Sequence, residues 1–269
     1  MLVSQHALAS VGSTEMDVDT REGPRVGDAF GATLLACLKA GLQPGIVRET
    51  VERDDGYLDG QDALFYFLPY EQWDALDHWL VDRAAGHALD VGSGAGRVAL
   101  HLQDEGHAVT ALDISPAACA VCRQRGVRTV IEGTVFELPG SPSEPQFDSV
   151  LMLGNNLGLL ESRRHAPLLL GALATRTRPG ALILGRGLDP YATENPLHLR
   201  YHARNEVLGR MGGQIRIRVR HHDMATPYFD YLFATIDELR TLLQGTAWTL
   251  QEYEQDGPSY GVVLRKKER

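Results

Sequence analysis

The sequence predicts a doubly wound α/β domain, with a mainly parallel sheet and helices on both faces of that sheet. Two observations lead to this prediction. Between residues 72 and 185, short apolar runs alternate with segments of helical apolar spacing, which is typical of parallel strands joined by crossover helices. The first apolar run, residues 88–91, ends in a turn with three glycines. Glycines allow backbone angles that side chains forbid, so such a turn brings the main chain close to a ligand.

The elements of this central unit follow one another through short connections. Helical spacing predicts helices over residues 72–84, 97–102, 116–125 and 163–176. Apolar runs predict strands over residues 88–91, 108–112, 127–131, 147–153 and 181–185. Ser115 followed by Pro116 is typical of a helix start. Pro179-Gly180 is typical of a turn, and a Pro/Ser-rich loop is expected over residues 138–146.

Segments of different character flank this unit, so we divide the chain into residues 1–70, 71–190, 191–234 and 235–269. The first 26 residues are polar and acidic and are expected to form a mobile tail. An amphipathic helix over 27–40, closed by Gly41, and the aromatic-rich segment after it are expected to form a helical lid. Residues 215–220 alternate between apolar residues and arginine, which predicts a half-exposed strand of an extra antiparallel hairpin with 228–234. A helix over 236–243 and strands over 248–253 and 260–264 complete the chain.

The glycine turn itself indicates which ligand it binds. Gly92, Gly94 and Gly96 do not have the spacing of a dinucleotide fingerprint, because Arg97 stands where the third glycine of G-x-G-x-x-G belongs. Asp90, two residues before the first glycine, would repel a pyrophosphate but would attract an amino group or a sulfonium. Asp113 ends the next strand, about 20 residues on, where a carboxylate binds a ribose diol. The pattern therefore favours a cationic nucleoside and disfavours an NAD-dependent oxidoreductase.

At residues 73–187 the chain resembles the class I S-adenosylmethionine-dependent methyltransferases, whose first motif has the same order of acid, spacer and glycines. The resemblance implies a seven-stranded sheet, with the last strand of the chain inserted between its neighbours. It implies S-adenosylmethionine as cofactor, with S-adenosylhomocysteine as product. The cofactor-binding residues it implies are Asp90, Gly92, Gly94, Gly96, Arg97, Asp113, Ile114, Thr134, Val135, Leu153 and Asn155.

Two further segments carry this resemblance. Residues 131–139 look like the family segment that meets the adenine, although Thr134 stands where the family usually has an acid. Leu153-Gly154-Asn155-Asn156 resembles the strand end of small-amine N-methyltransferases of the glycine and sarcosine type. Asn155 and Asn156 also suit a plain helix-capping role. The second segment favours an amine as the methyl acceptor.

Candidate catalytic residues lie outside the central unit. Methyl transfer to a hydroxyl needs a base, and an amine must arrive neutral, so we considered His198, His202 and His222 as bases of the lid. The alternatives are solvated histidines on a polar connection, or a metal site that also uses Asp223. Tyr66 is a candidate for lining the substrate cavity and for stabilising the sulfonium by a cation–π contact.

Composition limits the classes of partner and location. The net charge of -9 argues against broad nucleic-acid contact. No apolar run of membrane-spanning length and no signal peptide are recognised, so a cytoplasmic monomer or homodimer is expected. The C-x-x-C of Cys119 and Cys122 invites a metal or redox interpretation, but its helical surroundings favour simple packing.

The prediction from sequence is thus a methyltransferase of a small metabolite or natural-product intermediate, with an amine nitrogen favoured over a hydroxyl oxygen. A peptide methyltransferase is one alternative. Another is a cofactor-binding sensor or non-catalytic partner subunit of the same fold. The arginines of residues 215–220 leave two possibilities open. If they face inward, they suit an acceptor with a carboxylate or phosphate, and if they face outward they are solvated.

Overall fold

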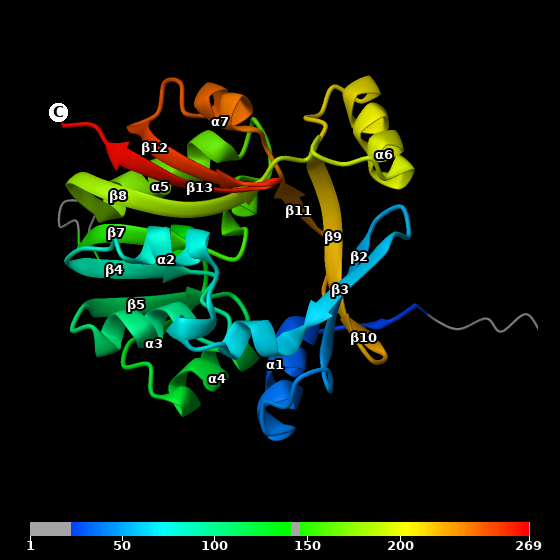
Figure 1. Cartoon of the computed structure of the whole chain (residues 1–269), viewed down its shortest axis with the longest axis horizontal. Helices are drawn as coiled ribbons and strands as arrows, with labels where there is room; N and C mark the ends of the chain where they lie inside the picture. The colour runs from blue at the N-terminus through cyan, green and yellow to red at the C-terminus, as the bar shows by residue number, and fades with distance from the viewer. Residues whose placement is uncertain (1–22, 141–145, 269) are drawn as a thin grey trace, which may run out of the picture.

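A computed structural model describes residues 23–140 and 146–268 and contains two sheets (Figure 1). The larger one has seven strands in the order β12-β13-β8-β7-β4-β5-β6. Its strands are β4 (His87–Val91), β5 (Ala108–Asp113), β6 (Val130–Glu132), β7 (Phe147–Met152), β8 (Thr177–Leu188), β12 (Trp248–Asp256) and β13 (Ser259–Lys266). Strands β4 to β8 are parallel, and β13 lies antiparallel between β8 and β12. The predicted insertion of the last strand is therefore confirmed.

Helices cover both faces of this sheet, as predicted. On one face, α2 (Ala75–Val81) and α3 (Arg97–Asp104) pack against side chains such as Ala88 and Leu184. On the other face, α5 (Ala166–Arg176) and α7 (Ile236–Leu242) pack against side chains such as Leu89 and Ile183. Neighbouring residues of one strand thus enter different cores, because successive side chains of a strand point to opposite faces. This double burial explains the continuous apolar runs in the sequence.

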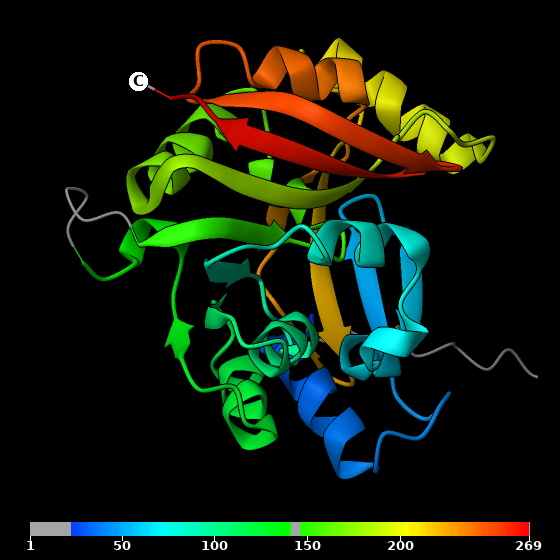
Figure 2. The ribbon, with the colours of Figure 1, turned by 60° about the vertical axis from the view of Figure 1, so that its left-hand side comes forward.

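The second sheet has six strands and stands beside the carboxyl ends of the core strands (Figures 1 and 2). Its main path is β1-β10-β9-β2-β3, and β11 also pairs with β9. The strands are β1 (Arg25–Val26), β2 (Arg48–Arg53), β3 (Leu58–Asp62), β9 (Gln214–His221), β10 (Met224–Ala225) and β11 (Phe229–Leu232). The helices α1 (Ala29–Lys39), α4 (Pro116–Arg125) and α6 (Pro196–Val207) complete the arrangement, together with short 3₁₀ turns.

Three expectations for the flanking segments need correction. The N-terminal segment is not a purely helical lid, because α1 is followed by the antiparallel strands β2 and β3. The expected hairpin is confirmed as the antiparallel pair of β9 and β11, but it belongs to a larger sheet in which β9 also pairs with β2. The expected 26-residue tail is too long by at least two residues, because Arg25 and Val26 pair with β10. Its residues 1–22 lie outside the described part of the chain.

Candidate functional site

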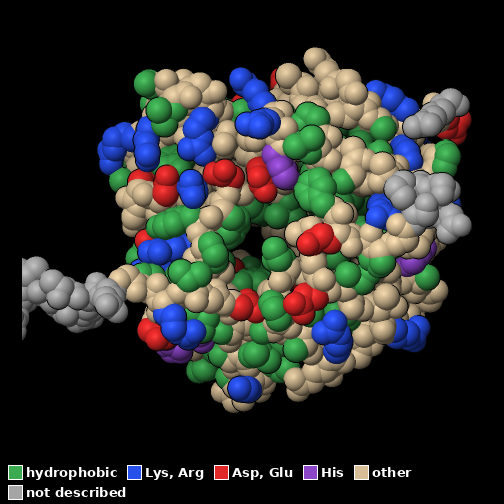
Figure 3. Space-filling view, turned by 180° about the vertical axis from the view of Figure 1, so that it is seen from behind, with side chains coloured by type: hydrophobic (Ala, Val, Ile, Leu, Met, Phe, Trp, Pro, Cys, Tyr) green, Lys and Arg blue, Asp and Glu red, His purple; other side chains and the backbone are tan. Residues whose placement is uncertain are grey.

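A cavity of about 1200 Å³ separates the two sheets. Its floor consists of the segments that follow β4, β5, β6, β7 and β8, which all end on this side of the core sheet. Its roof is the inner face of the second sheet, with the apolar side chains Val51, Ile215, Ile217, Val219, Phe229, Tyr231 and Phe233. In Figure 3 the hollow at the centre of the molecule is bordered by hydrophobic and acidic side chains. The arrangement encloses a ligand of small-molecule size.

The glycine turn after β4 forms part of the floor. Gly92, Gly94 and Gly96 have φ values of 68°, 55° and 74°, a left-handed region that side chains disfavour. A β-carbon on Gly92 would lie 2.5 Å from Nδ2 of Asn156, and that amide donates to the carbonyls of Val91 and Gly92. The sequence suggested for Asn156 a place in the strand-end motif of small-amine N-methyltransferases or a plain capping role. Its position indicates that it braces the turn instead.

Asp113 joins the end of β5 to this turn. Its Oδ2 accepts from the backbone N–H of Gly94 at 2.8 Å, and its Oδ1 accepts from that of Ser115 at 2.9 Å. Burial, opposed by these backbone hydrogen bonds, raises the pKa of Asp113 to about 6. Each carboxylate oxygen can accept a second hydrogen bond, so the group remains able to bind a pair of hydroxyls. Beside it, Ile114 borders the cavity with 72% of its surface exposed, which suits an aromatic ring that would cover it.

Asp90 is the second buried acid of the floor. Its side chain is 3% exposed, and its Oδ2 lacks a hydrogen-bond partner within the described chain. Burial raises the pKa of Asp90 to about 7, although the positive charge of Arg97 opposes the shift. Arg97 itself donates to Asp77 at 2.5 Å and lies over the rings of Phe65 and Trp73. A buried carboxylate with an unsatisfied oxygen is costly unless a cation or donor reaches it.

The other predicted cofactor residues lie on the same floor. Thr134 and Val135 line the cavity, but the hydroxyl of Thr134 donates to Glu137 at 2.8 Å and so helps to start a 3₁₀ turn. Leu153 and Asn155 line the cavity after β7. Asn155 has a φ of 68°, and its Oδ1 is buried without a partner among the described residues. That oxygen is a free hydrogen-bond acceptor at the cavity.

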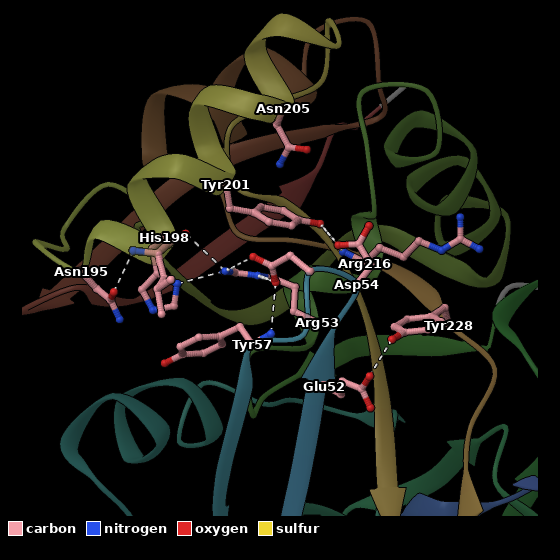
Figure 4. Close-up of polar contacts among 12 residues, drawn as sticks. Glu52, Arg53, Asp54, Tyr57, Asn195, His198, Tyr201, Asn205, Arg216 and Tyr228 are labelled. Atoms are coloured by element: carbon pink, nitrogen blue, oxygen red, sulfur yellow. Dashed lines mark hydrogen bonds and ion pairs between the residues drawn. The ribbon is translucent and has the colours of Figure 1, made fainter. Parts of the chain in front are cut away.

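The predicted catalytic histidines separate into two groups. His198 and His202 of α6 line the cavity, and burial lowers the pKa of both, so both are neutral near pH 7. Figure 4 shows His198 beside Arg53 and Tyr57; its Nδ1 lies 2.9 Å from Nη1 of Arg53. Because Arg53 can only donate, Nδ1 accepts and Nε2 carries the proton. Nδ1 of His202 is buried without a partner in the described structure.

His222 does not join this group, so its proposed role as a base of the lid is not supported. It is exposed at the β9–β10 turn, against His221, and does not line the cavity. The alternative of a metal site with Asp223 has no support either. Residues 23–140 and 146–268 contain no group of three His, Cys, Asp or Glu residues placed to hold a metal ion. Cys119 and Cys122 lie inside α4. Burial raises the pKa of these thiols to about 11 and about 12, and the Cys122 thiol donates to the carbonyl of Gly94.

Tyr66 lines the cavity and contacts Glu49, an acid that was not predicted from the sequence. Its hydroxyl donates to Oε2 of Glu49 at 2.6 Å, and the amide of Gln61 donates to the same oxygen at 3.0 Å. Glu49 is 5% exposed and lines the cavity from β2. The only signal in the sequence is the alternation in Arg48–Arg53, where Glu49, Val51 and Arg53 share one face.

The arginines of β9 point away from the cavity. Ile215, Ile217 and Val219 face the cavity, so the intervening arginines face outward. On that outer face, Arg218 and Arg220 bind Glu52 at 2.9 and 3.1 Å, and Figure 4 shows Tyr228 donating to the same carboxylate. The outward alternative is therefore the correct one for Arg218 and Arg220.

Acidic side chains outnumber arginines around the cavity. The acids are Asp28, Glu49, Asp59, Asp90, Asp113, Glu161, Asp189 and Asp230, and the arginines are Arg53 and Arg97. Both arginines already bind an acid, since Arg53 contacts Asp55 through two nitrogens and Arg97 contacts Asp77, although Nη1 of Arg97 is buried without a partner among the described residues. The cavity therefore favours a cation over an anion.

Comparisons with known proteins agree with this geometry. A family model described as a methyltransferase domain matches residues 88–180. The fold is similar to that of an S-adenosylmethionine-dependent methyltransferase from Bacteroides fragilis in complex with S-adenosyl-L-homocysteine. The two chains share 25% sequence identity with a TM-score of 0.74, and the match covers 90% of this chain and 95% of that one. No helix in the described part of the chain is long and apolar enough to cross a membrane.

Two more distant structures share the fold. A 1,6-didemethyltoxoflavin-N1-methyltransferase from Burkholderia thailandensis is 16% identical with a TM-score of 0.50, and the match covers 94% of this chain and 98% of that one. The CcbJ methyltransferase from Streptomyces caelestis is 15% identical with a TM-score of 0.55, covering 74% and 95%. Comparison with curated protein sequences found no significant match.

Proposed function

Since residues 88–180 form a class I S-adenosylmethionine-dependent methyltransferase domain, we propose that this enzyme methylates a small-molecule acceptor at an amine nitrogen rather than at a hydroxyl oxygen. The observation that carries the proposal is the cavity of about 1200 Å³, which extends from the glycine turn to an apolar roof. It has room for a nucleoside cofactor and a second small molecule in one enclosure. A small metabolite or natural-product intermediate is the expected acceptor.

The floor of the cavity fits the cofactor. Asp113 offers carboxylate oxygens to the ribose hydroxyls, and Ile114 offers an exposed apolar surface to the adenine. Asp90 and Asn155 each have a buried oxygen without a partner among the described residues, and these oxygens suit the amino group of the methionine moiety. S-Adenosylmethionine, when bound, supplies a methyl group that its sulfonium already activates.

The chain then has little covalent chemistry to perform. Its floor and roof hold the acceptor in line with the methyl group, and the apolar roof keeps water away from both. The excess of acids around the cavity supports an acceptor that is a cation before reaction, as most amines are near pH 7. An anionic acceptor has no support from Arg218 or Arg220, because both lie on the outer face.

Two measurements test the proposal. Isothermal titration with S-adenosylmethionine, S-adenosylhomocysteine and NAD should give binding of the first two and none of NAD. Transfer of a labelled methyl group is then measured on a panel of amines, phenols and a peptide. Labelling of amines is the expected result. Labelling of phenols alone would refute the choice of nitrogen, and labelling of the peptide alone would refute the small-molecule acceptor.

A further inference from the structure

Glu49 is a buried acid that no positive charge of the described chain neutralises, and burial raises its pKa. Its side chain is 5% exposed, and among the described residues its hydrogen bonds come from the neutral groups of Tyr66 and Gln61. No lysine, arginine or histidine of the described chain forms a salt bridge with it, and the nearby charge of Asp59 is negative. Glu52, three residues further along β2 and on its outer face, is by contrast held by two arginines. An unpaired buried carboxylate destabilises a protein, so a binding role is the natural reason for its presence.

One oxygen of Glu49 is available to a ligand. Both donors, the Tyr66 hydroxyl and the Gln61 amide, bind Oε2. Within residues 23–140 and 146–268, the structure gives Oε1 no hydrogen-bond partner. Because Glu49 lines the cavity, Oε1 can accept a hydrogen bond from a molecule inside it. The two donors fix the carboxylate in place, so little conformational entropy is lost when a ligand binds.

Aromatic rings connect Glu49 with the floor of the cavity. A β-carbon placed on Gly94 would lie 3.6 Å from the ring of Tyr66, so this ring lies directly above the glycine turn. The hydroxyl of Tyr231 donates to the carbonyl of Asn155 at 2.6 Å. Both tyrosines line the cavity, and burial together with the negative charge of Glu49 raises the pKa of both hydroxyls. Aromatic faces beside a carboxylate are suited to bind an ammonium group.

The opposite end of the roof does not offer such a site. Arg53 lies four residues from Glu49 along β2, about 13 Å at the usual strand rise. Its guanidinium is bound by Asp55 and His198 and lies 4.2 Å from the centre of the Tyr201 ring. Figure 4 shows Arg53 between His198 and Tyr201. It is therefore a fixed part of the link between β2 and α6. The unpaired charge of the roof lies at the end nearer the glycine turn.

We propose that Glu49, together with the rings of Tyr66 and Tyr231, forms the subsite that receives the protonated amine of the acceptor. This proposal rests on the proposed function and specifies its substrate class, a primary or secondary alkylammonium whose nitrogen lies close to the glycine turn. One proton of the ammonium must pass to a base, here Oε1 of Glu49, before the neutral nitrogen can accept a methyl group. Glu49 then selects amines over alcohols of the same shape, because the alcohol leaves the buried charge without a counterion.

The test compares matched amines and alcohols as probes. Binding of benzylamine, phenethylamine and cyclohexylmethylamine, and of the corresponding alcohols, is measured by isothermal titration on the full chain saturated with S-adenosylhomocysteine at pH 7.5. The wild-type protein should bind at least one amine ten-fold or more tightly than its alcohol. Glu49→Gln should reduce this preference to less than two-fold. Glu52→Gln, the same substitution on the outer face of the same strand, should keep it.

Thermal unfolding of the ligand-free variants provides a second readout. Glu49→Gln should melt no lower than wild type, since the amide keeps the shape and removes the buried charge. A marked fall in its melting temperature would show that the carboxylate is structural and would overturn the inference. So would a wild-type protein without any preference for amines, or a preference that survives in Glu49→Gln. Failure of the wild-type chain to bind S-adenosylhomocysteine would instead refute the proposed function.

Discussion

Replacement of Asp113 by alanine should separate the two tasks of this carboxylate. Toward the cofactor, the variant loses hydrogen bonds from ribose hydroxyls to a charged acceptor, which are worth about 1–3 kcal/mol in total. This corresponds to roughly 5- to 150-fold weaker binding of S-adenosylmethionine. Toward the fold, it leaves the N–H groups of Gly94 and Ser115 without their acceptor. The free energy of unfolding should fall by about 1–3 kcal/mol.

The assay must distinguish a lost ribose contact from a disturbed turn. Isothermal titration is therefore done with S-adenosylhomocysteine and with its 2′-deoxy and 3′-deoxy forms, on wild type and on Asp113→Ala. If Asp113 binds the ribose, wild type loses affinity for the deoxy forms, whereas the variant binds all three alike. Chemical denaturation confirms that the variant is folded and gives its loss of stability.

Two outcomes would refute the reasoning. An unchanged dissociation constant for S-adenosylhomocysteine in a folded Asp113→Ala would remove the ribose assignment. Equal losses for the deoxy forms in wild type and variant would show that Asp113 acts only through the turn. The pKa of about 6 adds a condition, because a protonated carboxyl is a poorer acceptor. All titrations should therefore be done at pH 8.

Three further substitutions, one of them with a matched control, test other parts of the site. Because burial raises the pKa of Asp90 to about 7 from an ordinary 3.8, the folded ligand-free protein binds the extra proton, and its stability should fall as pH rises from about 4 to about 7, by at most about 4 kcal/mol. Asp90→Asn should lose this contribution to the pH dependence in thermal melts, whereas the contribution of Asp113, whose pKa burial raises to about 6, should remain. The variant should also bind S-adenosylmethionine more weakly, and an unchanged pH profile would contradict the assignment. Gly94→Val should abolish S-adenosylhomocysteine binding. The control is Gly245→Val, at a glycine with a φ of 74° and, apart from its chain neighbours, no described atoms within 4 Å of an added β-carbon. This control should lose a similar amount of stability, about 1–2 kcal/mol, through its backbone strain but still bind S-adenosylhomocysteine. Arg218→Ala should lower stability by about 1 kcal/mol or less through the lost contact with Glu52 and leave the acceptor KM unchanged, and a raised KM would place this arginine in the site.

The core sheet was predictable because each of its strands satisfies a local rule. Leu89 and Ile183 enter one core while their neighbours Ala88 and Leu184 enter the other, so burial on two faces leaves an apolar run in the sequence. The turn was predictable for a similar reason, since Gly92, Gly94 and Gly96 all have positive φ values. Both signals are contained within a few consecutive residues.

The second sheet was not predictable in the same way. Strand β2 has the sequence Arg48–Arg53 and contains only one apolar residue, Val51. Its cavity face carries the buried charged residues Glu49 and Arg53, so the strand lacks an apolar alternation. Its partner β9 lies some 170 positions later in the chain. A local pattern cannot reveal such a pairing.

The candidate site likewise has a predictable part on the core sheet and a part on the second sheet that was not predictable. Its floor residues were predicted because they follow the core strands. All of them line the cavity except Gly94 and Gly96, which are buried within the turn. His198, His202 and Tyr66 also line the cavity, and their catalytic roles stay predictions. His222 lies outside because the chain reverses direction directly after β9, at a residue with a φ of 52°. Glu49 was missed because its strand was missed.

The pairing of β2 with β9 has a consequence for the order in which the chain folds. Thr50 pairs with Arg220, and closing a loop of that length from the unfolded chain costs about 4–5 kcal/mol of entropy. The cost falls once the intervening core has folded, so we expect the core to form first and the roof to assemble on it. During synthesis, β2 and β3 leave the ribosome long before β9 exists, and a two-stranded hairpin is barely stable alone. The charged residues of Arg48–Arg53 and Leu58–Asp62 keep these unpaired strands hydrated, so they resist pairing with strands of other chains.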